Sequence, residues 1–338
     1  MPATPFMPPV GVNTGALKPG ILQRISLFRG GAQDTNSISL APIVKVATRA
    51  GFYHYFAEND ALLTGQPIDP LTPVDYDTPA SPGGLRISSG SFNSNLYRWG
   101  FQVFPLQQIA EFAARGEDIT ARAAFKLGGQ AKQHHAKVLG AILDTDGNFS
   151  ATPTSAGGAT TPLQNEINAL LIDLAKQGVD LNEGRWVAAC NLNTANDMLQ
   201  FNTVAQQGYA LAYAGGTDTA RTGATDMSQL KAWFLSKLIC PLELVVLNQF
   251  LPSTADTVGT PVIANGRLAI FKVAEAYGDS GFVQTMTPDP NAALGQIYTY
   301  DVRQGLIGIG LHVESDYGIT VLGGPANKWA ACLKGVSL

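Results

Sequence analysis

Residues 117–143 read EDITARAAFKLGGQAKQHHAKVLGAIL, and this stretch has the pattern of one long α-helix. Its apolar residues keep the three- to four-residue spacing that places them on one helical face: Ala124, Leu127, Ala131, Val138, Leu139 and Ile142. Glu117 and Asp118 stand at the start, where negative charge interacts favourably with the helix dipole. At 1.5 Å per residue the predicted helix is about 40 Å long. The pair Gly128–Gly129 predicts either a bend or close packing against a neighbouring backbone.

Two strand-like runs precede this helix and enclose a polar connector. Residues 43–57 (IVKVATRAGFYHYFA) alternate apolar and polar side chains and are rich in β-formers, which predicts one strand. Residues 85–104 (LRISSGSFNSNLYRWGFQVF) predict a second β run. The connector between them is rich in Pro, Asp, Thr and Gly, so we expect a long excursion that leaves the core and returns. Residues 1–40 hold repeated Pro and Gly, with one short helix expected near residues 21–28, and predict an extended arm that lies on a neighbour.

The rest of the chain mixes helices and strands without an internal repeat. Thr161 and Pro162 predict the start of a second helix, as N-cap and first helical residue, and Gly178 predicts its end. The apolar face of that helix is expected to consist of Ile167, Leu170, Leu171 and Leu174. Short helices are expected after Asn193 and after Asp226 or Ser228. Strands are expected over residues 184–192, 242–248, 267–277, 297–315 and 328–336.

The composition points towards self-association. Only 14% of the residues are charged, against the roughly 25% usual for soluble globular chains. A chain with so few charges is expected to cover part of its surface with copies of itself. The formal net charge of −4, with no cluster of Lys and Arg, disfavours binding to nucleic acid through phosphate neutralisation. The three cysteines are far apart in apolar surroundings and predict reduced, buried thiols: Cys190, Cys240 and Cys332. No signal peptide or membrane-spanning run is predicted.

Two short motifs resemble parts of known sites but lack the remainder. Asp144, Asp146 and Asn148 alternate as at the start of a calcium-binding loop. Phe149 stands where that loop needs glycine, so a helix-ending turn is the favoured interpretation. Residues 278–281 read GDSG, as in the nucleophile loop of trypsin-like proteases, but no upstream histidine has a suitable context. A turn between strands is predicted there.

The histidines do not predict a metal site. His134 and His135 are adjacent on a helix and point about 100° apart, so they cannot chelate one ion together. We expect one of them to be packed and the other solvated. His312 and Glu314 lie two residues apart on one strand face, but no third ligand is in sight. Residues 305–310 (GLIGIG) are not followed by a helix and do not form a dinucleotide loop. No catalytic residue, cofactor site or metal site is therefore predicted.

The order of elements resembles the Hong Kong 97-like major capsid proteins of tailed bacteriophages, as does the run SSGSFNSNLYRWGFQVFPLQQIAEFAARGEDI that leads into the long helix. The resemblance covers nearly the whole chain and implies an α+β fold. It implies an N-terminal arm (1–42), an extended β loop with flanking strands (43–100), a peripheral domain (101–184) with spine helix 117–143, an axial domain (185–298) and a return to the peripheral domain (299–338).

The resemblance implies a structural protein and not an enzyme. Its expected function is that of the major capsid (head) protein of a virion, self-assembling as pentamers and hexamers into an icosahedral shell around double-stranded DNA. The family further implies assembly in the host cytoplasm with a portal, without a membrane, cofactor or sequence-specific DNA binding. A separate scaffolding protein is expected, because the residues ahead of the extended loop are too few to hold a built-in scaffold. Candidate contacts between subunits are Arg86, Tyr97 and Trp99, since Arg and aromatic residues are enriched at interfaces.

Three other functions stay open at this point. An encapsulin-like cellular nanocompartment has a shell of the same fold, and cargo loading without DNA would distinguish it. A soluble α/β enzyme would need a pocket of convergent polar groups. A phage tail-tube or decoration protein would usually be shorter and mostly β.

Overall fold

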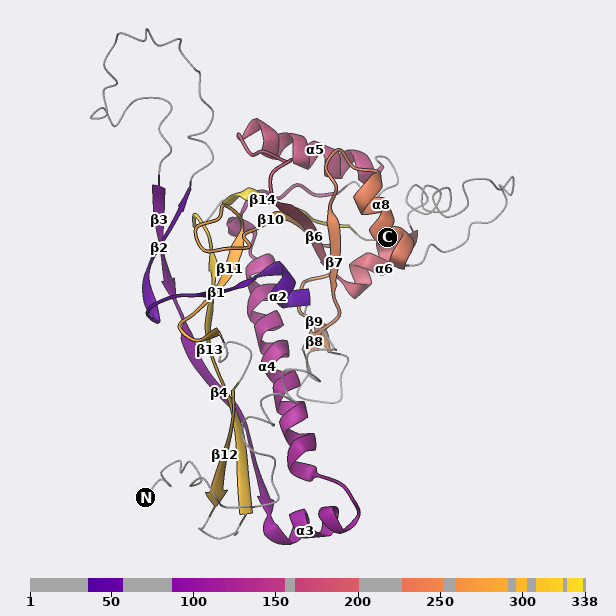
Figure 1. Ribbon diagram of the computed structural model, residues 1–338. Helices are drawn as coiled ribbons and strands as arrows, with labels where there is room; N and C mark the ends of the chain where they lie inside the picture. Colours follow the sequence, from indigo (N-terminus) through magenta and orange to yellow (C-terminus); the bar gives the residue numbers. More distant parts are fainter. Residues whose placement is uncertain are drawn as a thin grey trace, which may run out of the picture.

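The structure is a computed structural model, and it describes residues 36–56, 87–155, 162–200, 227–251, 259–290, 296–302, 308–324 and 327–336. Figure 1 shows a long helix, α4 (Ile119–Leu143), running beside long strands, with a layered α/β region at its C-terminal end. Several expectations concern residues outside the described ranges: most of the arm, the helix near residues 21–28, the tip of the extended loop, Thr161 as a cap and Asp226 as a cap. None of the described helices is long and apolar enough to span a bilayer.

The predicted long helix is confirmed, but it begins at residue 119 and not at residue 117. Asp118 ends the preceding turn, and its carboxylate accepts hydrogen bonds from the backbone N–H groups of Thr120 and Ala121, both at 3.0 Å. These bonds satisfy two donors that have no partner within the helix, so Asp118 is the N-cap.

A close backbone contact of α4 lies at Gly140, whereas Gly129 of the predicted pair has open space beside it. A Cβ atom built at Gly129 would meet nothing within 4 Å, whereas one at Gly140 would lie 2.0 Å from the carbonyl oxygen of Val262. The helix continues without interruption through Gly128 and Gly129. The last turn of α4 therefore rests directly on the backbone of the chain near residue 262.

A five-stranded sheet runs along α4. Its order is β1-β11-β13-β12, and β4 also pairs with β13. The strands are β1 (Ile43–Lys45), β4 (Asn95–Pro105), β11 (Val283–Thr287), β12 (Gln296–Val302) and β13 (Gly308–Val321). Residues of α4 pack on this sheet in a small apolar core that includes Phe104, Ala124, Leu127, Leu311 and Val313. The long strand β13 pairs antiparallel with β11, β12 and β4, and so ties this part together.

The prediction of one strand over residues 43–57 is wrong, because the chain changes partner within it. β1 pairs parallel with β11, while β2 (Ala50–Phe56) pairs antiparallel with β3 (Ile87–Asn93). Arg49 stands at the break, and its side chain bonds Asp316 at 2.8 Å. The second predicted β run, residues 85–104, is also divided, into β3 and β4, and its division lies beside Arg49. Between them the buried Ser94 donates its backbone N–H to the Arg49 carbonyl at 2.7 Å.

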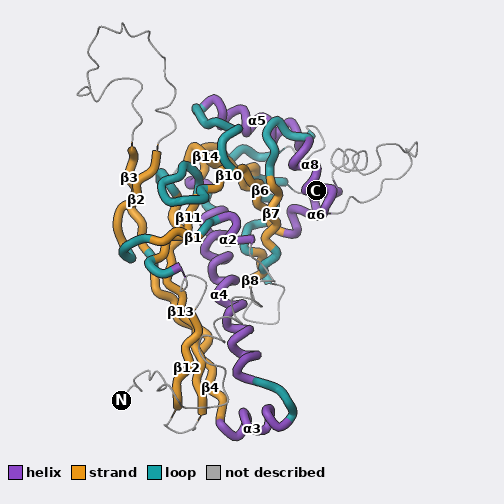
Figure 2. The backbone as a smooth tube through the Cα atoms, viewed as in Figure 1, coloured by secondary structure: helices purple, strands orange, loops and turns teal. Residues whose placement is uncertain are grey.

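A second five-stranded sheet forms the layered region (Figure 2), with the order β5-β14-β10-β6-β7. Its strands are β5 (Phe149–Ala151), β6 (Arg185–Asn191), β7 (Glu243–Leu247), β10 (Leu268–Val273) and β14 (Asn327–Leu333). One face packs against α5 (Leu163–Lys176), α6 (Leu192–Gln200) and α8 (Met227–Ser236). The other face packs against α2 (Asn36–Leu40) and the end of α4. Two short strands, β8 (Phe250–Leu251) and β9 (Thr260–Pro261), form a separate pair.

The predicted helix caps of this region are partly wrong. The apolar face expected for α5 is buried as predicted, but Pro162 occupies the cap position and not the first helical one. In α6 the capping side chain is Asn191 and not Asn193: its Oδ1 accepts the Thr194 backbone N–H at 2.7 Å. Asn193 instead donates to the side chain of Asn265.

The layered sheet draws its strands from segments that the sequence assigned to different domains. β6, β7 and β10 come from the expected axial domain, whereas β5 and β14 come from the expected peripheral domain and its return. The helix α5, also expected to be peripheral, packs in the same apolar core as Trp186 and Ile270. The division into axial and peripheral domains stays a prediction. The three cysteines are buried and free, as predicted.

Candidate assembly surfaces

One helix has an apolar face that the described part of the chain leaves largely exposed. α3 (Leu106–Ala114) has no buried residue, although its sequence LQQIAEFAA repeats apolar side chains at helical spacing. Leu106 is 49% exposed, and Ile109 is only partly buried against the core beneath it. An apolar helix face of this kind is normally covered, so α3 is a candidate contact surface.

The face of α3 forms one wall of a groove whose other wall is the start of α4. The groove encloses about 540 Å³. It is lined by Leu106, Ile109, Ala110, Ala113, Gly116, Glu117, Asp118, Ile119, Thr120 and Ile309. Two of these residues are acidic and none is basic, so the groove combines apolar walls with negative charge. We call it the α3–α4 groove.

A second apolar surface lies on the outer side of the layered region, over α5 and α8. Ile172, Leu235 and Ile239 are 45%, 52% and 56% exposed. The backbone N–H of Ile239 donates to Asn168 Oδ1 at 3.1 Å, which joins the segment after α8 to α5. Asn168 and Ile172 are one turn apart on α5 and share a face. The two helices therefore present apolar side chains together.

The β2–β3 hairpin carries the ends of the expected extended loop. Tyr53 fixes the hairpin to the sheet: its hydroxyl donates to the Val321 carbonyl at 3.2 Å and accepts the Gly323 N–H at 3.0 Å. The side chain of Phe52 points the other way and is 73% exposed. The two arms of the excursion thus pair with each other as expected, and their root is anchored to the subunit.

Of the three predicted contact residues, the structure describes Tyr97 in full and only the backbone of Trp99. Tyr97, on β4, lies with its ring 4.4 Å from that of His134 and 5.3 Å from that of Tyr317, so it packs within its own subunit. The backbone of Trp99 pairs with Val313, and its side chain lies outside what the structure describes. Arg86 also lies outside the described residues. A role for these three residues between subunits stays a prediction.

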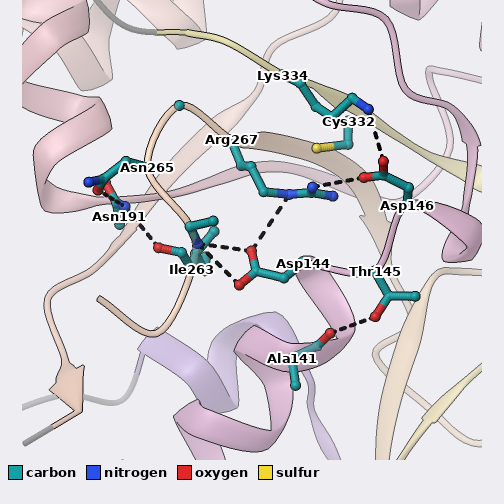
Figure 3. Close-up of polar contacts among 12 residues, drawn as sticks. Ala141, Asp144, Thr145, Asp146, Asn191, Ile263, Asn265, Arg267, Cys332 and Lys334 are labelled. Carbon is teal, nitrogen blue, oxygen red and sulfur yellow. Dashed lines mark hydrogen bonds and ion pairs between the residues drawn. The ribbon is translucent and has the colours of Figure 1, made fainter. Parts of the chain in front are cut away.

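The DTDGN segment forms the turn that ends α4, as predicted, and it is part of a polar joint (Figure 3). Asp144 accepts the backbone N–H of Ala264 at 2.9 Å. Asp146 accepts one hydrogen bond from Arg267 and one from Lys334, each at 2.8 Å. These bonds tie the end of α4 to the segment before β10 and to the residue after β14.

The two carboxylates of this joint have opposite pKa shifts. Burial raises the pKa of Asp144, while the hydrogen bonds from Lys334 and Arg267 lower the pKa of Asp146. Both carboxylates therefore have defined partners within the fold, and Arg267 lies between them, with its Nε 3.6 Å from Asp144. Paired in this way, they function as a structural contact between segments.

The remaining motifs also have structural partners. GDSG forms the turn between β10 and β11, where Ser280 accepts a hydrogen bond from Lys272 at 2.8 Å. His312 and Glu314 do share a strand face and lie 3.2 Å apart, and Glu314 also binds Arg98. Among the described residues no three His, Cys, Asp or Glu side chains come together as metal ligands.

The adjacent histidines of α4 differ in burial, as predicted, although neither is fully solvated. His135 is buried, and its two ring nitrogens lie 3.1 Å from the Ser37 hydroxyl and 2.9 Å from the Thr285 hydroxyl. His134 is half-buried and lies 2.7 Å from the hydroxyl of Tyr317. His135 therefore joins α2, α4 and β11. The pKa of His135 is lowered to about 4, mainly by burial and to a smaller extent by the nearby His134.

This burial makes the stability of the subunit depend on pH. The unfolded chain binds a proton at His135 near the ordinary pKa of 6.5, whereas the folded chain binds it only near 4. Lowering the pH from 7 to 5 therefore favours the unfolded state, by about 2 kcal/mol from this residue. Denaturant unfolding at several pH values should show this loss in the parent chain and a smaller one in His135→Gln. Equal slopes in the two proteins would contradict the assignment.

Comparison with known proteins gives a match in structure alone. No protein family matches the sequence, and no curated protein matches it. A phage-related protein from Bordetella bronchiseptica RB50 superposes with a TM-score of 0.63 at 12% identity, over 94% of this chain and 97% of that one. The head structure of Helicobacter pylori bacteriophage KHP40 matches with a TM-score of 0.52 at 12% identity, over 86% of each chain. The chain has the Hong Kong 97-like fold.

Within the Hong Kong 97-like fold, the helix expected as the spine helix is α4, and the arms of the expected extended loop are β2 and β3. The α3–α4 groove and the α5–α8 surface were not predicted. The sequence did contain a signal for the first of them, since Leu106, Ile109, Ala110 and Ala113 follow helical spacing immediately ahead of the long helix. What the sequence did not reveal is that none of the elements described in the structure covers them.

Proposed function

We propose that the chain is the major capsid (head) subunit of a tailed-bacteriophage particle. Many copies would assemble as pentamers and hexamers into an icosahedral shell around double-stranded DNA. The observation that carries the proposal is that one fold, over 86% of this chain, recurs in the head structure of a bacteriophage. A portal and a separate scaffolding protein are the further partners in this proposal, and the virion is the location.

The surfaces of the subunit support an assembling protein. Apolar side chains are exposed on α3, on α5 and α8, and on the β2–β3 hairpin, which are separate parts of the molecule (Figure 1). A single binding site would need one such surface, whereas a subunit of a closed shell contacts neighbours on several sides. The charged fraction of 14% agrees with extensive burial between copies.

The described side chains with candidate chemistry support a structural protein over an enzyme. Asp144 and Asp146 are bonded to backbone and to cationic side chains, and His135 is held between two hydroxyl groups. General acid–base catalysis needs such groups to face a substrate. No observation favours the encapsulin-like alternative, and the content of purified particles separates the two: packaged DNA supports the phage shell, and protein cargo supports the nanocompartment.

Assembly is tested by expression and electron microscopy. Purified chain supplied with its scaffolding partner should form closed shells in negative stain, whereas the chain by itself should give aberrant shells, tubes or free subunits. Light scattering across salt and protein concentration should report particles far above subunit mass. A stable monomer under all of these conditions, with the partner present, would overturn the proposal. Uniform closed shells formed by the chain alone would contradict only the proposed need for a scaffolding protein.

A further inference from the structure

We propose that the α3–α4 groove binds residues 18–29 of the chain's own N-terminal segment. The groove needs an apolar occupant, because four of its lining side chains are aliphatic and lie on a helix with no buried residue, α3. It also favours a cationic occupant, because its charged lining residues are Glu117 and Asp118. An occupant that is both apolar and basic is therefore the best match.

Residues 18–29 read KPGILQRISLFR and have this composition. The segment carries three basic residues, Lys18, Arg24 and Arg29, and no acidic residue precedes Asp34. Its apolar side chains are Ile21, Leu22, Ile25, Leu27 and Phe28. The rest of the chain has an excess of acidic residues, since the net charge is −4 overall. The basic segment and the acidic groove are thus complementary in charge, and both also carry apolar side chains.

The carboxylates of the groove are available to a cation at its rim. Asp118 uses one oxygen, Oδ1, for the backbone N–H groups of Thr120 and Ala121 and for the Thr120 hydroxyl. A carboxylate oxygen of Glu117 lies 3.7 Å from a guanidinium nitrogen of Arg122, and both side chains are more than half exposed. An exposed pair of this kind contributes little and is easily exchanged for another cation.

The first described residue lies within reach of the groove. Asn36 begins α2. The next residue, Ser37, forms a hydrogen bond with His135 on α4, and the start of α4 forms one wall of the groove. From residue 135 back to residue 119, α4 spans about 24 Å. The residues between 29 and 36 extend roughly 20 Å or more when stretched, which is comparable with this distance along α4.

The test places a photo-crosslinking amino acid, benzoylphenylalanine, at Ala110 in the groove of the full chain. After irradiation and digestion, mass spectrometry should find residues 18–29 as the main partner peptide. The same label at Ile239, on the α5–α8 surface, should not capture that peptide. Crosslinks are read on soluble and on assembled protein, so the result does not depend on shell formation.

Charge variants decide whether the contact is specific. Glu117→Lys should lower the crosslink yield roughly three- to tenfold, because an attraction becomes a repulsion. Glu111→Lys makes the same change on α3 outside the groove and should leave the yield within about twofold. Reversal of Lys18, Arg24 and Arg29 to Glu should restore capture in the Glu117→Lys chain. Capture of another segment at Ala110, no capture at all, or equal effects of the two single variants would overturn the proposal, and a circular-dichroism spectrum confirms that each variant is folded.

Discussion

Replacing residues 63–84 by a short Gly/Ser linker should stop particle formation and leave the thermal unfolding of the subunit nearly unchanged. The replaced residues lie beyond the last strand pair, Phe56 with Ile87, so the β2–β3 ladder stays intact. The hairpin keeps its anchor as well, because Tyr53 bonds the backbone at Val321 and Gly323. The replaced segment is rich in proline, and proline restricts the unfolded chain, which reduces the entropy lost when the segment is ordered on a neighbour.

The measurements are calorimetry for the subunit and negative-stain microscopy for the particles. A second variant, in which residues 63–84 are exchanged for an unrelated polar sequence of equal length, separates the contacts of the loop from its length. Both variants should fail to assemble if the loop makes specific contacts with neighbours. Normal particles from the Gly/Ser variant would show that the loop does not connect subunits, and a large fall in the unfolding temperature would show that it belongs to the subunit core.

Two glycine-to-alanine substitutions in the same helix should change stability in opposite directions. At Gly140 the new Cβ atom would lie 2.0 Å from the Val262 carbonyl oxygen, a backbone atom that cannot rotate away. The segment after residue 262 would have to move, and its bond from Ala264 to Asp144 would be strained. We expect Gly140→Ala to lower the free energy of unfolding by about 2 to 3 kcal/mol, after the gain in helix propensity.

Gly129→Ala is the matched control. Its Cβ atom would meet nothing within 4 Å, so only the higher helix propensity of alanine remains. This variant should raise the free energy of unfolding by up to about 1 kcal/mol. Urea unfolding of the two variants and the parent chain measures the difference. A Gly140→Ala chain as stable as the Gly129→Ala chain would mean that α4 does not rest on the backbone at residue 262.

Local features of the fold could be predicted from the sequence, and features set by distant partners could not. Helical spacing predicted α4 and α5, and alternation identified the β2–β3 arms. The break at Arg49 was missed because β1 pairs with β11, which is more than 200 residues away in the chain, while β2 pairs with β3. The contact of Gly140 with the backbone at Val262 was missed for the same reason, because these two residues are far apart in the chain. Which apolar helix faces stay uncovered is likewise decided by tertiary packing.

The candidate residues for assembly were predicted less well than the fold. Tyr97 was chosen because aromatic residues are common at interfaces, and it packs against His134 and Tyr317 of its own subunit. Aromatic side chains are as common in cores as at interfaces, so residue type did not separate the two. The exposed surfaces were identified from the relative exposure of Leu106, Ile172 and Leu235, which is a property of the folded chain.

The position of β14 in the layered sheet determines when this subunit can fold during synthesis. Residues 327–333 lie between β5 and β10, so a strand translated late fills the interior of the sheet. Until it emerges from the ribosome, β5 has no partner strand and β10 is paired on one edge only, with β6, and the apolar side chains that pack on Trp329 and Leu333 remain in water. The nascent chain therefore cannot close this core before synthesis has passed residue 333, and chains shorter than this are kept from acting as building blocks.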